Sequence, residues 1–279
     1  MVMKKHKRIA ASAATYILLI IALVWTIFPV YWMIKSSITV NSEMYVARPS
    51  LIAKHYTFEN YVDLFTKTEF PRALLNSLMI AFLTTVCCLL ISILGSYAMT
   101  RLKYPGRRFF KTSIIFSYLI PTAVLFVPMY VFVSKLGFYD NKWALLIIYP
   151  TTVVPYCCYM LMSYFKAIPY ALEEAALIDG CTRMKSLRYI ITPIALPGIA
   201  VVATFAFTMS WNEYLYAMIM TTSPAQQTAV VAISSFKYAD SAIWGRIMAA
   251  SVLTSLPVTI LYIVAQAQLI SGKSDGSVK

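Results

Sequence analysis

Charged residues are scarce in this chain. Only 13% of its 279 residues are Asp, Glu, Lys or Arg, about half the share of a typical soluble domain, while 60% are apolar. A soluble domain of this length leaves about a quarter of its unfolded surface in water and needs a polar skin to cover it. The composition therefore excludes a soluble domain, a disordered chain and a disulfide-built secreted domain. Part of the surface must face lipid.

Side chains that build metal centres, disulfides and catalytic sites are also few. The two histidines, His6 and His55, lie in polar flanking segments. The five cysteines have no C-x-x-C spacing, so we expect small packing residues rather than metal ligands or disulfides. The stretch G-K-S-D-G at 272–276 resembles a phosphate-binding loop and a nucleophile elbow. It lacks the earlier glycine of the first and the later histidine of the second. We therefore expect a non-catalytic chain with no metal site and no cofactor of its own.

Long apolar runs are what the sequence does contain. A helix needs about 20 residues to cross the hydrocarbon core of a bilayer. Six runs are long enough, and they are too uniformly apolar to be the strands of a membrane barrel. We therefore expect an all-α integral membrane protein with six transmembrane helices, the first retained because no signal-peptide cleavage site follows it. The runs are Ser12–Ile34, Leu74–Thr100, Ser113–Val133, Trp143–Phe165, Ile194–Met220 and Ile247–Ile270.

Basic residues are distributed unevenly between the segments that join these runs. If both termini are cytoplasmic, 15 of the 24 Lys and Arg residues lie inside and 7 outside. The net charge of +13 is then a membrane-orientation signal and not a nucleic-acid footprint. The predicted layout is a cytoplasmic tail (1–11), a first transmembrane helix (12–34), an extracytoplasmic loop (35–73), a five-helix core (74–270) and a second cytoplasmic tail (271–279).

Ionisable residues are nearly absent from the six runs. Glu213 is the only one, whereas a proton- or ion-coupled transporter usually needs several. If the chain serves active transport, the energy is expected to come from another subunit. Prolines within or beside the runs leave two interpretations open, kinked helices around a pathway and ordinary membrane-helix packing. They are Pro29, Pro121, Pro128, Pro150, Pro155, Pro197 and Pro257.

The segment 166–192 is predicted to be a cytoplasmic helix–turn–helix, with its coupling helices at 169–191. Pro169 is a good first helical position, and Gly180 supplies a left-handed stop after a helix of about two and a half turns. Thr182 can cap a second short helix, which Pro193 would end. A compact helix–turn–helix of this kind could fit a groove of a soluble partner. A plain linker between spans is the alternative.

This segment resembles the signature of ATP-binding-cassette (ABC) importer permeases. Residues 174–180 read E-A-A-L-I-D-G and 190–193 read I-I-T-P, where the family has E-A-A-x-x-D-G, nine residues and I-x-L-P. Thr192 replaces the usual leucine. Other stretches resemble the sugar-importer branch of the family, the maltose-type smaller permeases. They are G-S-Y-A-M-T-R at 95–101, L-G-F-Y-D-N at 136–141, W-N-E-Y at 211–214 and the tail G-K-S-D-G-S-V-K at 272–279.

The resemblance implies a type I ABC importer permease fold, a bacterial cell-membrane location and a set of partners. The partners are a second homologous permease, two ATPase subunits that bind ATP and Mg, an extracytoplasmic solute-binding protein and the lipid bilayer, with no nucleic acid. The loop 221–245 is expected to touch the binding protein, although its apolar part, 228–236, would also suit a lipid interface. The implied ATPase-coupling residues are Glu173, Glu174, Ala175, Ala176, Asp179 and Gly180.

The W-N-E-Y element supplies the candidate substrate-pathway residues, Trp211, Asn212, Glu213 and Tyr214. Glu213 could reach water and pair with a cation of the partner permease, or it could line the pathway with Asn212 and hydrogen-bond sugar hydroxyls. On a continuous helix three consecutive residues spread over about 200°. At most two can then face one cavity, so we expect Asn212 at the pathway or the permease interface and Trp211 in packing.

The leading hypothesis is thus a permease subunit of an ATP-driven, binding-protein-dependent sugar importer. One alternative keeps the machine and changes its cargo to a polyamine, phosphate or an amino acid. A stand-alone secondary transporter is less favoured because visible internal repeats and several intramembrane charges are missing. A membrane enzyme has no candidate catalytic group.

Overall fold

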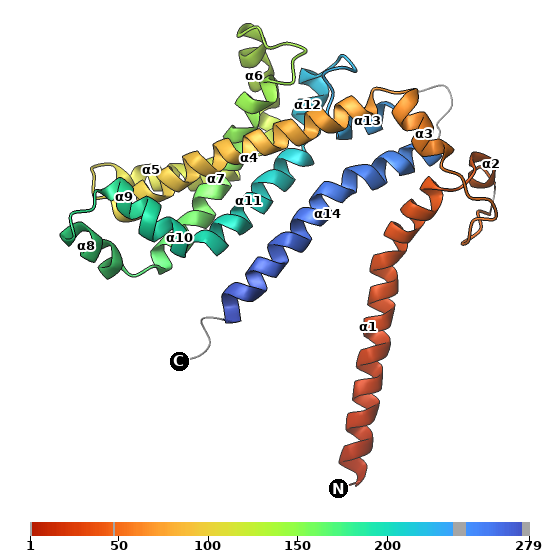
Figure 1. Cartoon of the computed structure of the whole chain (residues 1–279), viewed down its shortest axis with the longest axis horizontal. Coiled ribbons are helices and arrows are strands. Elements are labelled where there is room, and N and C mark those ends of the chain that lie inside the picture. The colour runs from red at the N-terminus through yellow and green to blue at the C-terminus, as the bar shows by residue number, and fades with distance from the viewer. Residues whose placement is uncertain (1, 47, 237–243, 275–279) are drawn as a thin grey trace. The chain divides into compact units, whose positions relative to one another are not determined.

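The computed structural model describes residues 2–46, 48–236 and 244–274, and the regular structure in these ranges is helical (Figure 1). An isolated antiparallel bridge joins Thr39 and Tyr56. The chain forms two compact units: residues 1–68 with 235–255, and residues 69–234 with 256–279. The predicted loop residues 237–243 and tail residues 275–279 lie outside the described part.

The first unit contains α1 (Val2–Ser37), α2 (Asn41–Met44), α3 (Glu59–Thr66) and the start of α14 (Trp244–Ser274). Asn60 of α3 ties α3 to the end of α1, because its side-chain amide donates to the carbonyls of Ser37 and Thr39 at 3.0 and 3.1 Å. Arg246 of α14 pairs with Asp63 of α3 at 2.9 Å. In α1 the apolar stretch from Thr15 to Ser37 has the length and composition of a membrane span.

The second unit is built around the long helix α4 (Phe70–Arg101). It packs against α7 (Ala144–Ala167) and α11 (Leu196–Trp211), and all three lie side by side in Figure 1. Their shared core includes Phe165 and Val202, both fully buried. Cys88, Cys157 and Cys158 are buried between these helices as small packing side chains.

Shorter helices complete the second unit. Bent helices flank the core, and short ones lie at its two ends. They are α5 (Arg107–Leu119), α6 (Thr122–Lys135), α8 (Tyr170–Ile178), α9 (Arg183–Ser186), a π-helical turn (Leu187–Ile191), α10 (Thr192–Ile194), α12 (Leu215–Met220) and α13 (Ala229–Ser235).

The structure confirms a helical membrane protein and shows breaks within two of the six predicted runs. Among the described residues, four helices have the length and apolar composition to cross a membrane, in Thr15–Ser37, Phe70–Arg101, Ala144–Ala167 and Trp244–Gln266. Two bent pairs raise the number to six if each is one span. The third predicted run is broken at Ile120 and Pro121, as the kinked-helix interpretation of the prolines allowed. The fifth is broken between Trp211 and Leu215, where one continuous helix was assumed for the W-N-E-Y element.

Two sharp bends in the second unit lie beside prolines. Residues 107–119 and 122–135 meet at 99°, and residues 183–194 and 196–211 meet at 82°. Ile120 has the extended conformation that a following proline favours, since Pro121 crowds its backbone. Pro197 stands at the start of α11, where its missing N–H needs no partner. Prolines inside α6 and α7 leave those helices unbroken, so proline alone does not predict a break.

Candidate functional site

The predicted helix–turn–helix is present as α8, a tight turn and α9. Gly180 has φ +84°, the left-handed conformation expected of a helix stop. The Thr182 hydroxyl accepts a hydrogen bond from the backbone N–H of Lys185 at 3.3 Å and caps α9. Pro193 does not end the second helix, contrary to expectation. A π-helical turn and α10 carry the chain on to the bend at Ala195.

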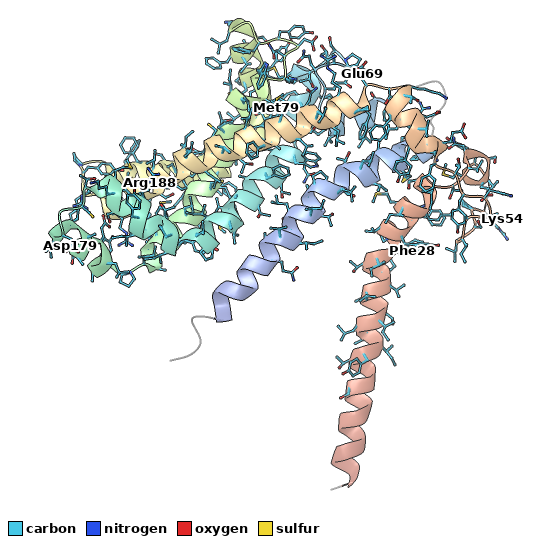
Figure 2. All side chains as sticks on the ribbon, viewed as in Figure 1. Phe28, Lys54, Glu69, Met79, Asp179 and Arg188 are labelled. Atoms are coloured by element: carbon cyan, nitrogen blue, oxygen red, sulfur yellow. The ribbon has the colours of Figure 1, made fainter. Side chains whose placement is uncertain are left out.

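The six predicted coupling residues divide between two faces of this hairpin. Glu173 and Ala176 are buried, with exposed fractions of 2% and 4%. The others are exposed, and Asp179, labelled in Figure 2, lies at the tip of the hairpin. The exposed residues are Glu174, Ala175, Asp179 and Gly180. One face is thus free to meet a partner while the other packs inward.

Glu173 is held by residues of two other helices, α4 and α9. Its carboxylate accepts a hydrogen bond from the Tyr97 hydroxyl of α4 at 2.5 Å, and Arg183 of α9 donates to it at 3.2 Å. The Nε atom of Arg101, also in α4, lies 3.8 Å from the other carboxylate oxygen of Glu173. The sequence analysis quoted 95–101 only for its resemblance, because nothing local in it indicates an ion pair with a residue more than 70 positions later.

The predicted pathway residues lie at a break in the helix, and not along a continuous one. Helix α11 ends at Trp211 and α12 begins at Leu215. Both carboxylate oxygens of Glu213 accept backbone N–H groups at the start of α12, at 3.0 Å from Tyr216 and 3.1 Å from Ala217. The reasoning from a 200° spread of consecutive residues therefore does not apply. The carboxylate of Glu213 is engaged in capping α12.

The two residues before Glu213 have opposite environments. Trp211 is 2% exposed and stacks on Phe207, with ring centres 5.5 Å apart. Asn212 is exposed, and its backbone N–H closes the last turn of α11. This geometry matches packing for Trp211 and an open position for Asn212, whose part in transport stays a prediction.

A cavity of about 520 Å³ opens at the break, and Asn212, Glu213 and Tyr214 line it. Hydroxyl groups and aromatic rings share this lining with the amide and the carboxylate. Such groups suit a neutral solute rich in hydroxyls, because rings cover its C–H faces and polar groups bond its oxygens. The other polar or aromatic lining residues are Thr122, Tyr149, Thr152, Phe205, Thr208, Ser210, Tyr216 and Tyr262.

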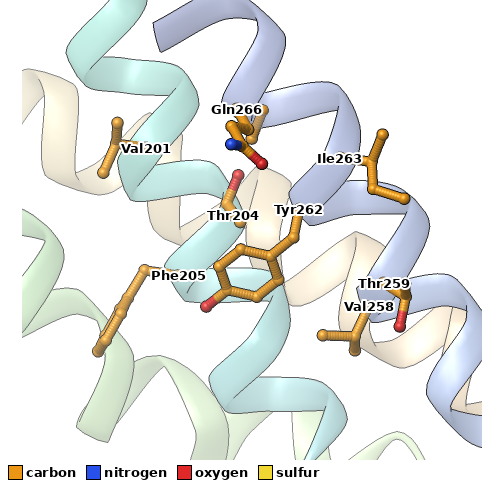
Figure 3. A pocket seen from close by; sticks show the side chains of 9 residues that line it. Val201, Thr204, Phe205, Val258, Thr259, Tyr262, Ile263 and Gln266 are labelled. Atoms are coloured by element: carbon orange, nitrogen blue, oxygen red, sulfur yellow. The ribbon is translucent and has the colours of Figure 1, made fainter. Parts of the chain in front are cut away.

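A neighbouring pocket of about 560 Å³ lies between α11 and the later part of α14 (Figure 3). Phe205 and Tyr262 line both pockets. Besides these two rings, the second lining has four aliphatic side chains and the polar residues Thr204, Thr259 and Gln266. Both pockets are mostly apolar, and the cavity at the helix break differs in having a carboxylate in its lining.

The segment after α12 is held from several sides. The carboxylate of Asp140 accepts hydrogen bonds from the hydroxyl and the backbone N–H of Ser223, and these bonds hold the pKa of Asp140 below its usual value. The Asn76 amide of α4 donates to the carbonyls of Ala225 and Gln227 at 3.1 and 3.0 Å. Lys142 donates to Asn76 at 2.7 Å. The predicted loop 221–245 is thus fixed in its first part.

The apolar part of that predicted loop is a helix. In α13 the side chains of Ala229, Val231 and Ala232 are buried against the protein. Ser77 of α4 accepts from the backbone N–H of Ala229 at 2.8 Å. Intramolecular packing therefore accounts for the apolar character of this stretch, which was expected to be a loop or a lipid-interface segment.

These features define a class of protein: a multi-pass helical membrane protein with a cavity at a helix break and an exposed helix–turn–helix between two spans. Residues 90–272 match the family described as binding-protein-dependent transport system inner membrane component. The chain belongs to this family. It is therefore a membrane permease subunit of the ABC importer type.

Relatives resemble the chain over its whole length. It is 35% identical to the inner membrane ABC transporter permease protein YcjP of Escherichia coli K12, across 99% of this chain and 100% of that protein. It is 31% identical to the trehalose transport system permease protein SugB of Mycobacterium tuberculosis, across 96% and 99%. It is 33% identical to the trehalose/maltose transport system permease protein MalG of Thermococcus litoralis, across 98% and 97%.

The fold is also that of solved importers. A chain of a bacterial ABC transporter for the polysaccharide alginate superposes with a TM-score of 0.80 at 21% identity, across 92% of this chain and 95% of that one. A chain of the MetNI methionine transporter superposes with a TM-score of 0.57 at 18% identity, across 73% and 95%. The first likeness spans nearly all of the chain, so the importer permease fold is not confined to its core.

Proposed function

We propose that this chain forms half of the translocation pathway of an ATP-driven sugar importer and couples it to an ATPase through the α8–α9 hairpin. The exposed face of α8 carries the proposal. Glu174 and Ala175 are exposed on α8, and Asp179 and Gly180 are exposed in the turn that follows it, on a short hairpin that joins two spans. A small amphipathic helix of this kind fits a groove on a soluble partner. In this proposal the ATPase subunits bind ATP and Mg, and this chain has no catalytic step.

The other partners are a second, homologous permease and an extracytoplasmic solute-binding protein. Sugar is the proposed cargo for two reasons. Relatives across the full length are named for trehalose and maltose, and the cavity at Asn212 combines an amide with aromatic rings. Asn212, Glu213, Tyr214 and Trp211 remain the proposed pathway element, with Glu213 and Trp211 acting by shaping it.

The same proposal sets the orientation. Both termini (1–11 and 271–279) and the hairpin lie in the cytoplasm, residues 35–73 lie outside, and 74–270 form the core. The excess of Lys and Arg on the proposed inner side supports this arrangement.

The test is to purify the chain with its partner permease and ATPase subunits and to reconstitute the complex in lipid nanodiscs. The ATPase subunits should co-purify, and the binding protein loaded with trehalose or maltose should stimulate ATP hydrolysis. Stimulation by a polyamine, phosphate or an amino acid instead would keep the importer and replace the cargo. Absence of any associated ATPase would refute the proposal.

A further inference from the structure

The buried face of α8 carries a charged cluster that docking of a partner does not use. Glu173 lies one residue before the E-A-A stretch and has an exposed fraction of 2%. A carboxylate is buried only where charged or polar partners compensate it. Here the Tyr97 hydroxyl at 2.5 Å and the Arg183 guanidinium at 3.2 Å bond one oxygen, and Arg101 lies within ion-pair distance of the other.

Arg101 fastens this cluster to two transmembrane helices. It is in the last turn of α4, and its side chain is fully buried. Its guanidinium donates to the carbonyl of Ile168 at 2.6 Å and to that of Phe165, both at the end of α7. It also stacks over the Tyr170 ring at 4.2 Å, and the Tyr170 hydroxyl donates to the carbonyl of Thr100 at 2.7 Å. The ends of α4 and α7 and the start of α8 thus meet at one point.

The contact is sensitive to loss of either charge. Within the described residues, Arg101 Nε and Nη1 and Glu173 Oε2 have no hydrogen-bond partner. The other oxygen of Glu173 is bonded by Tyr97 and Arg183, and the third nitrogen of Arg101 donates to the carbonyls of Phe165 and Ile168. Removing the carboxylate leaves the buried Arg101 guanidinium without its counter-charge, which weakens the contact more than loss of an exposed pair.

Helix α4 connects this point to the opposite end of the unit. Near its start, Asn76 bonds the carbonyls of Ala225 and Gln227, and Ser77 bonds the backbone of Ala229. Near its end, Tyr97 and Arg101 hold Glu173. With a rise of 1.5 Å per residue, the two points are roughly 30 Å apart along one unbroken helix. Helix α4 therefore links the hairpin to the 223–229 segment by direct contacts at both of its ends.

We propose that Glu173 is a positioning residue that locks the α8–α9 hairpin to α4, so that hairpin and 223–229 segment move as one body. The inference rests on the proposed function, since an ATPase must move the hairpin. It assigns Glu173 to transmission of that movement and leaves the contact with the ATPase to the exposed face. In this proposal α4 is the rigid secondary element that carries the coupling between the two sites.

The test compares Glu173→Gln with Glu174→Gln, which changes the neighbouring exposed carboxylate, in the reconstituted complex. Glu173→Gln should still assemble with the ATPase subunits and keep basal ATP hydrolysis, while stimulation by the loaded binding protein falls about five-fold or more. A spin label at Gln227 should respond to ATP and Mg in the wild type and lose that response in Glu173→Gln. Glu174→Gln should bind the ATPase subunits more weakly, so that assembly requires a higher concentration of them. Once assembled, it should keep both the stimulation of ATP hydrolysis and the response of the spin label.

Tyr97→Phe removes only the hydroxyl that donates to Glu173 and keeps the carboxylate. It tests the proposal if the Glu173→Gln complex fails to assemble. A reduced stimulation in Tyr97→Phe supports the proposal. Full stimulation and a normal label response in every assembled variant, Tyr97→Phe included, would overturn it. A wild-type complex without ATPase association would instead refute the proposed function, so the two failures are distinguishable.

Discussion

At the residue scale, two adjacent glutamates of α8 have opposite environments. Glu173 is buried against Tyr97, whereas Glu174 is exposed. A helix turns about 100° per residue, so neighbours point in different directions. The sequence predicted the helix and its stop at Gly180, because those depend on local chemistry. It did not predict which glutamate faces inward, because that depends on partners more than 70 residues earlier.

Gly180→Ala tests the turn of the hairpin. Gly180 has φ +84° and no atom within 4 Å of an added Cβ, so the only cost is conformational, about 1 kcal/mol. We expect the subunit to insert normally while the hairpin docks more weakly, which lowers stimulated ATP hydrolysis in the reconstituted complex. Gly137→Ala is the matched control, since Gly137 has the same φ and the same free space. Equal losses in both variants would point to general strain and not to docking.

Asp140 should make the stability of the 223–227 segment depend on pH. Hydrogen bonds from Ser223 lower the pKa of Asp140, so the carboxylate is favoured in the folded state. Its contribution is then complete above the unfolded pKa, about 3.9, and is lost as pH falls through the lower folded value. The melting temperature of the wild type should exceed that of Asp140→Asn at pH 6, and the difference should shrink towards pH 3. A constant difference would contradict this assignment.

At the element scale, the sequence located the apolar segments but not where they break. Proline occurs inside α6 and α7 without interrupting them, whereas the chain turns at Pro121. In a membrane bundle neighbouring groups can satisfy the carbonyls that proline frees, so one residue type permits both outcomes. The break before α12 has no proline, and its capping carboxylate, Glu213, was visible in the sequence only as an intramembrane charge.

Asn212→Ala and Glu213→Gln should have different effects because only Glu213 caps a helix. Gln keeps one acceptor oxygen but loses the second, so Glu213→Gln should destabilise α12 by about 1 kcal/mol and lower the melting temperature of the subunit. Asn212→Ala should leave stability and basal ATP hydrolysis unchanged and reduce sugar uptake. Loss of complex assembly in Asn212→Ala would favour the permease interface, and unchanged uptake would remove Asn212 from the pathway.

At the scale of the whole molecule, composition alone predicted a membrane protein, and the short motifs predicted its family. Both predictions depend on features repeated along the chain, which a few local errors do not remove. The prediction of membrane orientation has a different basis, because it depends on the difference between the numbers of basic residues on the two sides of the bilayer. The hairpin face and the 223–227 segment must lie on opposite sides if the chain works as an importer half.

Thiol labelling tests this orientation directly. In a variant without the five natural cysteines, Gln227→Cys should react with an impermeant thiol reagent added to intact cells. The neighbouring segment should remain in place, because Asn76 bonds the backbone carbonyl of Gln227 and not its side chain. Ile178→Cys is the matched control on the hairpin, where residue 178 is 86% exposed. It should react only after the membrane is opened. The reverse pattern would invert the topology and place the E-A-A face outside, where no ATPase could reach it.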